Sequence, residues 1–199
     1  MRSVLDLGCG GGTLTLALLD RYPQASATLV DFSKPMLAEA RERLAPFGAQ
    51  CRFVERDLSA RGWQREIDAQ APFDAVVSGF AIHHLTDDDK RALYGEVFAL
   101  LRPGGWFVNI EHVSSPTPWL GHVFDELLID SFYAHQRSLG TAKTRDEVAE
   151  EFVHRPDKHE NILAPVEEQC RWLRAAGYEE VDCYFKLFEL AVFGGRRPA

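Results

Sequence analysis

The stretch VLDLGCGGGTLT, Val4–Thr15, combines an apolar run, a glycine cluster and the start of a helical pattern. This order predicts a strand, a tight turn and a helix N-terminus, where backbone N–H groups and the helix dipole face a ligand. Glycine is needed in such a turn where φ is positive or where a Cβ would block the ligand. The stretch therefore predicts a site for a nucleotide-like ligand directly after the first strand.

The remaining composition is that of an ordinary globular protein. Of 199 residues, 46% are hydrophobic and 26% are charged, which predicts a single domain over residues 1–199. The four cysteines are scattered without a C-x-x-C pair, so we expect reduced thiols in the cytoplasm and no metal site. A net charge of −8 argues against nucleic acid as a partner, and no apolar run is long enough to span a membrane. The expected partner is a small molecule, and a homodimer is compatible with the sequence.

Strands and helices alternate along the first part of the chain. Helices are predicted over Thr13–Tyr22, after the N-cap Ser33, and after the N-cap Thr86 with its three following aspartates. The predicted strands are the apolar runs SVLDLG (3–8), SATLVDF (26–32), QCRFVERD (50–57), FDAVVSGF (73–80) and GWFVNIEHV (105–113). Apolar strands separated by helices favour a doubly wound, mostly parallel α/β sheet covered on both faces.

From residue 114 to about 164 the pattern becomes helical. One helix is predicted from Thr117 to near Gly140, and the capping box Thr144 and Glu147 opens a second, which Pro156 ends. A helical stretch of this length between sheet elements is longer than a plain crossover, so we interpret it as a cap over the site. After a helix from Pro165 to Gly177, the run EEVDCYFKLFELAVFGG (179–195) predicts two antiparallel strands, which complete a seven-stranded Rossmann-like sheet.

The spacing of the glycines separates two kinds of ligand. A dinucleotide turn has the pattern G-x-G-x-x-G, which from Gly8 and Gly10 requires a glycine at Thr13, whereas the third glycine here is Gly12. Asp31 ends the second predicted strand about twenty residues on, where a carboxylate accepts both ribose hydroxyls of an adenosine. The pattern therefore favours an adenosine ligand and excludes the dinucleotide fingerprint.

These residues resemble the class I S-adenosylmethionine-dependent methyltransferases along essentially the whole chain. VLDLGCGGG is similar to the first motif of that family, LVDFSKPML to the second and ERDLS to the third. FDAVVSGFAIHHL and LLRPGGWFVNIEH resemble the fourth and fifth strand regions. The resemblance implies S-adenosylmethionine as the cofactor, S-adenosylhomocysteine as its product, and cofactor contacts from Asp6, Gly8, Gly10, Gly12, Asp31, Phe32, Met36, Asp57, Leu58, Ser78, Gly79 and Phe80. In that set Asp31 would hold the ribose, Phe32 and Met36 would flank the adenine, and Asp57 would accept from its amino group.

Histidines and one glutamate follow the fourth and fifth predicted strands. Open α/β sheets place functional groups at these strand ends, so His84 and Glu111 are the candidates for a catalytic base. Because adjacent residues of a strand point to opposite sides, only one of His83 and His84 is expected to face the site. The candidates for substrate contacts are His83, His112, Tyr133, Arg137 and Arg155.

Three functions remain open at this stage. The first is methyl transfer to a small molecule. The second follows from residues 165–195, which resemble the end of the carboxy-S-adenosylmethionine synthases; that family binds the added carboxylate with an arginine just before this helix, and Arg155 lies one residue out of register, where Pro156 stands. The third is a non-catalytic cofactor-binding protein or an incomplete fragment, since relatives usually carry a helix or more before the first strand. Either the start of this sequence is misassigned or trimmed, or the cap over residues 114–164 replaces that helix.

Overall fold

The computed structural model describes residues 1–155, 158 and 160–199. One seven-stranded sheet has the order β3-β2-β1-β4-β5-β7-β6. The strands are β1 (Ser3–Leu7), β2 (Ser26–Asp31), β3 (Cys51–Glu55), β4 (Phe73–Gly79), β5 (Leu101–His112), β6 (Glu179–Leu187) and β7 (Leu190–Arg196). The first five are parallel, whereas β7 runs antiparallel to both β5 and β6. The α/β fold and the C-terminal antiparallel strands predicted from the sequence are confirmed.

Within the described residues, six α-helices connect these strands. They are α1 (Thr13–Arg21), α2 (Lys34–Arg43), α3 (Asp87–Leu100), α4 (Pro118–Ser138), α5 (Arg145–Phe152) and α6 (Val166–Ala175). The predicted N-caps Ser33, Thr86 and Thr144 all accept hydrogen bonds from their helices, and Thr144 with Glu147 forms the complete capping box. The predicted end of the second cap helix at Pro156 lies outside the described residues, and α5 ends at Phe152.

Strand β5 begins earlier than the sequence indicated. The sequence predicted this strand over residues 105–113, but β5 starts at Leu101, which pairs with Phe73 of β4. An irregularity in that pairing, with Gly104 at φ 77°, lets the strand continue through the turn-forming stretch RPGG (102–105). Leu101 therefore belongs to the sheet, and α3 ends at Leu100.

The helices cover the two faces of the sheet unequally. α1 and α2 pack with Val4, Leu29 and Val77 on one face, and α3 and α6 pack on the other. On the α1 side of β5 and β6 no helix covers the sheet among the described residues, and Trp106 and Tyr184 remain 39% and 46% exposed there. The prediction of a sheet covered on both faces is therefore wrong for this half, because the order of elements supplies α3 and α6 to the same face.

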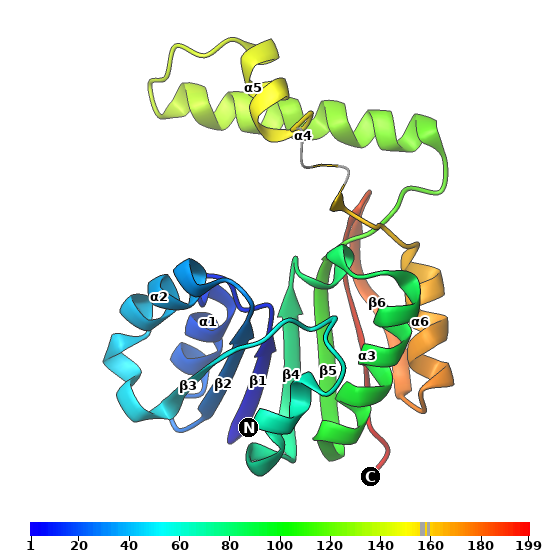
Figure 1. Ribbon diagram of the computed structural model, residues 1–199. Helices are drawn as coiled ribbons and strands as arrows, with labels where there is room; N and C mark the ends of the chain where they lie inside the picture. Colours follow the sequence, from blue (N-terminus) through cyan, green and yellow to red (C-terminus); the bar gives the residue numbers. More distant parts are fainter. Residues whose placement is uncertain (156–157, 159) are drawn as a thin grey trace.

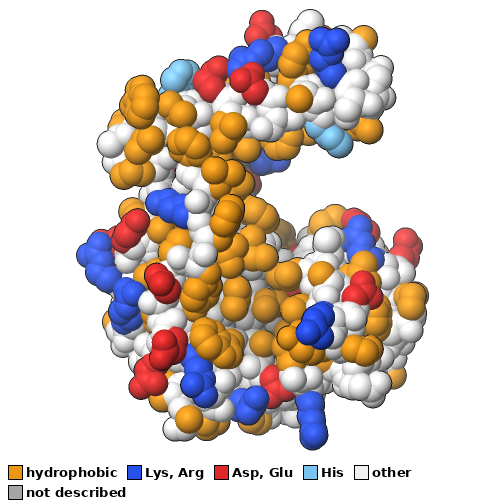
Figure 2. Space-filling view, turned by 180° about the vertical axis from the view of Figure 1, so that it is seen from behind, with side chains coloured by type: hydrophobic (Ala, Val, Ile, Leu, Met, Phe, Trp, Pro, Cys, Tyr) orange, Lys and Arg blue, Asp and Glu red, His pale blue; other side chains and the backbone are white. Residues whose placement is uncertain are grey.

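The cap, which we define as α4 and α5, stands above the carboxyl ends of the parallel strands (Figure 1). Its own small core joins Ile129, Ala149 and Val153, with Phe132 and Phe152 stacked at 5.1 Å. Two segments join the cap to the sheet: the outgoing stem, which follows β5, and the returning stem, which precedes α6. They meet where the N–H of Ser114 donates to the carbonyl of Ala164 at 3.2 Å. The space-filling view shows a deep notch between cap and sheet (Figure 2).

Candidate active site

A large cavity lies where β1, β2 and β4 end, as expected for an open α/β sheet. Its volume is about 930 Å³, which is large for a small-molecule site. The glycine turn, Asp31 and the segment after β4 form its walls. We call it the cofactor cavity, in keeping with the resemblance described above.

The glycine turn is held against β2 by its backbone. The N–H groups of Gly8 and Cys9 both donate to the carbonyl of Val30, at 2.8 and 3.1 Å. Gly8 has φ 63°, and a Cβ on it would lie 2.1 Å from the Cβ of Ala81, so no other residue fits there. The turn thus touches the segment after β4, which closes the cavity from the other side.

Asp31 is fixed at the end of β2 by two backbone donors. The N–H of Gly10 donates to Oδ2 and the N–H of Ser33 donates to Oδ1, both at 2.8 Å. Each carboxylate oxygen has a second lone pair, and Asp31 lines the cavity. The arrangement can accept hydrogen bonds from two neighbouring hydroxyl groups of one ligand.

Asp6 forms part of the cavity floor. Its side chain is 1% exposed, and Oδ2 accepts a hydrogen bond from the hydroxyl of Thr15 at 2.6 Å. Burial raises the pKa of Asp6 to about 6. Among the described residues nothing donates to the buried Oδ1. A cationic or N–H-bearing ligand group would satisfy this oxygen and favour the ionised carboxylate.

The far end of the cavity is more open. Phe32 is 73% exposed and Met36 is 37% exposed, and both line the cavity opposite Asp57 and Leu58. Oδ1 of Asp57 accepts hydrogen bonds from the N–H and hydroxyl of Ser59, at 2.8 and 2.7 Å, so the carboxylate also orders its own loop. Two apolar side chains beside a carboxylate suit a flat heteroaromatic ring with an exocyclic amino group.

Two residues that the resemblance assigned to the cofactor lie outside this cavity wall. Ser78 is fully buried, and its hydroxyl donates to the carbonyl of Leu7 at 2.8 Å, which ties β4 to β1. Gly12 serves as the N-cap of α1 with φ 77°. The other predicted neighbours, Gly79 and Phe80, do line the cavity, and Phe80 has φ 53°.

The two adjacent histidines lie on a single turn of 3-10 helix, Ile82–His84, and not on a strand. The expectation that only one of them faces the site is therefore wrong, because both line the smaller cavity and their rings lie 4.0 Å apart. His84 also borders the cofactor cavity. Burial and the neighbouring His83 lower the pKa of His84, which keeps its ring neutral near pH 7.

Glu111 pairs with His83 and not with His84, with which the sequence had grouped it. Nδ1 of His83 lies 2.6 Å from Oε1 of Glu111, and the backbone N–H of His83 donates to Oε2 at 3.1 Å. The N–H of His112 adds a third donor at 2.8 Å, and Glu111 is 1% exposed. A buried carboxylate with these donors fixes the ring of His83 with Nδ1 toward it.

The smaller cavity, which we call the chamber, has a volume of about 390 Å³ and lies beneath the cap. It shares Phe80 and His84 with the cofactor cavity, so the two spaces adjoin at these side chains. Its wall combines polar groups from several segments with apolar ones, namely His83, His112, Arg155 and Asn161 with Phe124, Leu128 and Leu190. A molecule in the chamber would therefore lie next to a ligand of the larger cavity.

Sequence reasoning missed Glu189, which holds the second predicted histidine of the chamber. Nε2 of His112 lies 2.9 Å from Oε2 of Glu189, and the N–H of Ser115 donates to Oε1 at 3.2 Å. Glu189 lies in the turn between β6 and β7 and is only 8% exposed. An acidic residue between Leu187, Phe188, Leu190 and Ala191 is the one signal that could have pointed to it.

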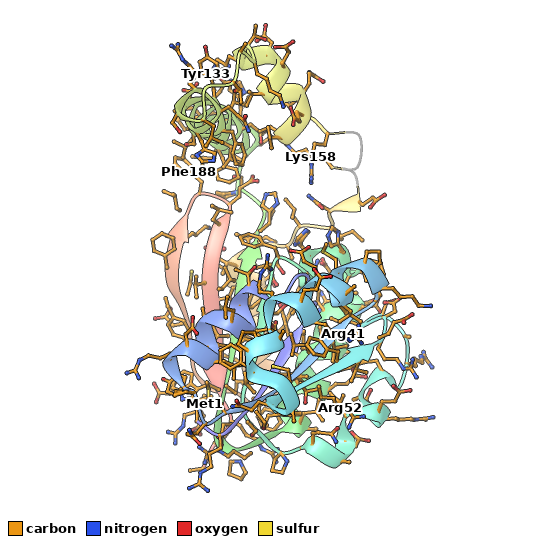
Figure 3. The ribbon with its side chains drawn as sticks, turned by 90° about the vertical axis from the view of Figure 1, so that its left-hand side faces the viewer. Met1, Arg41, Arg52, Tyr133, Lys158 and Phe188 are labelled. Carbon is orange, nitrogen blue, oxygen red and sulfur yellow. The ribbon has the colours of Figure 1, made fainter. Side chains whose placement is uncertain are left out.

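Of the three substrate residues predicted between residues 114 and 164, one lines the chamber and two do not. Arg155 lines the chamber, whereas Tyr133 and Arg137 line neither cavity and lie beside each other on the outer part of α4. Figure 3 shows Tyr133 high on the cap and Phe188 at the hairpin turn beneath it. On the same helix, Trp119 is 69% exposed, while Phe124 is buried and lines the chamber.

Three further observations concern metal binding, membrane-spanning helices and the cysteines. Across the described part of the chain, no three His, Cys, Asp or Glu side chains are placed to hold a metal ion. Nor does any described helix have the length and apolarity that crossing a bilayer requires. All four cysteines are free thiols.

Comparison with known proteins agrees with this geometry. A model of the methyltransferase-domain family matches residues 4–105, just over half of the chain. The chain therefore belongs to the class I S-adenosylmethionine-dependent methyltransferase family.

Individual relatives differ in how much of the chain they match. The carboxy-S-adenosyl-L-methionine synthase of Chromohalobacter salexigens is 30% identical over 192 residues, which cover 94% of this chain and 66% of that protein. The demethylmenaquinone methyltransferase of Thermus thermophilus is 35% identical over 123 residues, 62% of this chain and 53% of that protein. An O-methyltransferase family protein from Burkholderia thailandensis has the same fold, with a TM-score of 0.68 at 20% identity over the whole chain and 51% of its own length. The chain thus spans between half and two thirds of these three proteins.

Proposed function

We propose that this protein transfers the methyl group of S-adenosylmethionine to a small molecule bound in the chamber. The observation that carries the proposal is that the cofactor cavity and the chamber adjoin at Phe80 and His84, with His83, which is paired with the buried Glu111, in the chamber wall. The unpaired cysteines support a reducing, cytoplasmic setting.

The cavity fits the cofactor on three observations. Asp31 has acceptor capacity for two ribose hydroxyls, the unsatisfied Oδ1 of Asp6 suits the methionine ammonium group, and the Phe32–Met36 side suits the adenine. When bound, S-adenosylmethionine supplies an electrophilic methyl group on its sulfonium. The protein's own task is then to exclude water and to align the acceptor, which lowers the barrier by several kcal/mol.

In this proposal His83 takes a proton from the acceptor. Because Nδ1 faces Glu111, Nε2 is left to receive the proton that an oxygen, nitrogen or carbon nucleophile loses. Glu111 stabilises the imidazolium that forms. In this assignment His84 instead separates the two cavities with a neutral ring.

The test is an incubation with methyl-labelled S-adenosylmethionine and a cell extract freed of protein, followed by mass spectrometry. We expect a labelled small molecule whose formation falls by about a hundredfold or more in His83→Asn, with binding of S-adenosylhomocysteine unchanged. His154→Asn is the matched control, because that exposed histidine also pairs with a glutamate, at 3.4 Å, but lies on the cap away from the chamber. Tight cofactor binding without any labelled product would favour a non-catalytic binding protein.

A second candidate is modification of the cofactor itself. The synthase relatives match 94% and 96% of the chain, including the cap, whereas the demethylmenaquinone methyltransferase matches 62%. Arg155 lines the chamber, and in this candidate its guanidinium group would bind the added carboxylate. Incubation with S-adenosylmethionine and prephenate, followed by mass spectrometry of the cofactor, separates the two: a carboxylated cofactor supports this candidate, and an unchanged cofactor supports methyl transfer.

A further inference from the structure

Two of the histidines that line the chamber are each paired with a carboxylate. His83 is held by Glu111 at 2.6 Å and His112 is held by Glu189 at 2.9 Å. The rings of His83 and His112 are 6.0 Å apart at an interplanar angle of 66°, and both line the chamber. Only the first pair has a role in the function proposed above, so the second requires a separate explanation.

Glu189 holds His112 in one orientation. Burial raises the pKa of Glu189, but hydrogen bonds from His112 and Ser115 outweigh it, so that the pKa lies below its usual range and the carboxylate is ionised. An ionised carboxylate only accepts, so Nε2 of His112 carries the proton that points at Glu189. Within the described part of the chain no hydrogen bond engages Nδ1 of His112, which is thus available to a molecule in the chamber.

The position of Glu189 also depends on the cap. Its backbone carbonyl accepts from the N–H of Val113 at 2.7 Å, and its Oε1 accepts from the N–H of Ser115 in the outgoing stem. A Cβ on Gly121 of α4 would lie 3.5 Å from Oε1 of Glu189, so the first turn of α4 packs against this carboxylate. Beside it, the ring of Phe188 lies 6.2 Å from that of Phe124. The hairpin turn therefore supports the cap and orients His112 at once.

We propose that His112 is a second acceptor-binding imidazole and that Glu189 is its positioning residue, so that the acceptor carries a second polar group besides the one that is methylated. This inference rests on the proposed function. His83 contacts the reacting group, and His112 contacts its polar neighbour through Nδ1. The apolar side chains Phe80, Phe124, Leu128 and Leu190 then surround the carbon skeleton of the acceptor. A small cyclic or aromatic molecule with two oxygen or nitrogen substituents has this chemistry.

The first part of the test uses the full chain with S-adenosylhomocysteine bound and ¹⁵N-labelled histidine. Imidazole nitrogen shifts report which nitrogen carries the proton, and the His112 signal is assigned by its loss in His112→Asn. We expect the Nε2–H tautomer in the wild-type protein and a mixture of tautomers in Glu189→Gln, since an amide both donates and accepts. Glu150→Gln is the control, because Glu150 pairs with the exposed His154 outside the chamber. An unchanged tautomer of His112 in Glu189→Gln would overturn the positioning role.

The second part titrates the same complex with phenol and the three dihydroxybenzenes, which differ by one hydroxyl group and its position. One hydrogen bond corresponds to about three- to tenfold in affinity, so at least one dihydroxybenzene should bind that much more tightly than phenol and shift both histidine signals. This advantage should disappear in Glu189→Gln and persist in Glu150→Gln. No advantage of any dihydroxybenzene, or one that persists in Glu189→Gln, refutes the second polar contact. Failure of S-adenosylhomocysteine to bind in the first place refutes the proposed function instead.

Discussion

Replacing Asp31 by asparagine should weaken binding of S-adenosylhomocysteine by roughly 10- to 100-fold. The N–H groups of Gly10 and Ser33 already occupy one lone pair on each carboxylate oxygen, at 2.8 Å. An asparagine has one oxygen and one NH₂ group, so in either orientation its NH₂ group faces one of these N–H donors and cannot accept from a ribose hydroxyl. The variant thus loses one hydrogen bond to a charged acceptor, worth about 1.5–3 kcal/mol, which gives the stated factor.

Isothermal titration calorimetry with S-adenosylhomocysteine measures this loss directly. The matched control is Glu55→Gln, because Glu55 pairs with Asp31 in the neighbouring strand but does not line the cofactor cavity. We expect Glu55→Gln to bind within about twofold of the wild-type protein, since its exposed ion pair with Lys34 contributes little. Wild-type affinity in Asp31→Asn would refute the assignment of the ribose to this carboxylate.

Three further predictions concern stability. Gly8→Ala places a Cβ 2.1 Å from that of Ala81 at a positive φ, so the melting temperature should fall by about 5–15 °C, as read by calorimetry. Burial raises the pKa of Asp6 to about 6, so the ligand-free protein should lose stability relative to Asp6→Asn as pH rises from 4 through 6, as read from the difference between their melting temperatures. Lys90→Met removes a buried ammonium group that donates to the carbonyl of Ile162 in the returning stem. Trypsin should therefore cleave the cap of this variant several-fold faster. An unchanged cleavage rate would exclude Lys90 as a residue that holds the returning stem.

The fold could be predicted because its signals are local. N-caps, the capping box and the glycine turn each depend on a few neighbouring residues, and all three occur as expected. The start of β5 could not be predicted, because pairing of Leu101 with Phe73 outweighs the turn propensity of RPGG. The uncovered face around Trp106 depends on which side each helix packs, and the sequence pattern of single elements does not specify it.

The two cavities differ in how far their residues could be predicted from the sequence. Asp31 follows a strand, and its two donors, Gly10 and Ser33, lie close along the chain or in the recognised turn. His83 and His84 were expected at an extended strand end, but they lie on a 3-10 turn. Because this turn brings His83 to Glu111, we propose His83 and not His84 as the base. Glu189 lies 77 residues from His112, and no periodicity connects two such positions.

This difference explains why family membership leaves the acceptor open. The family model matches residues 4–105, which include the glycine turn, Asp31 and the histidine turn. Six of the nine residues that line the chamber lie outside that range, in His112, the first half of α4, the returning stem and the start of β7. On the proposed function, the matched part would hold the cofactor and supply His83, whereas most of the residues that would hold the acceptor lie in the unmatched part. Since Glu189 joins two of these segments through Ser115 and His112, a change in the cap or in the hairpin should alter acceptor choice without altering cofactor binding.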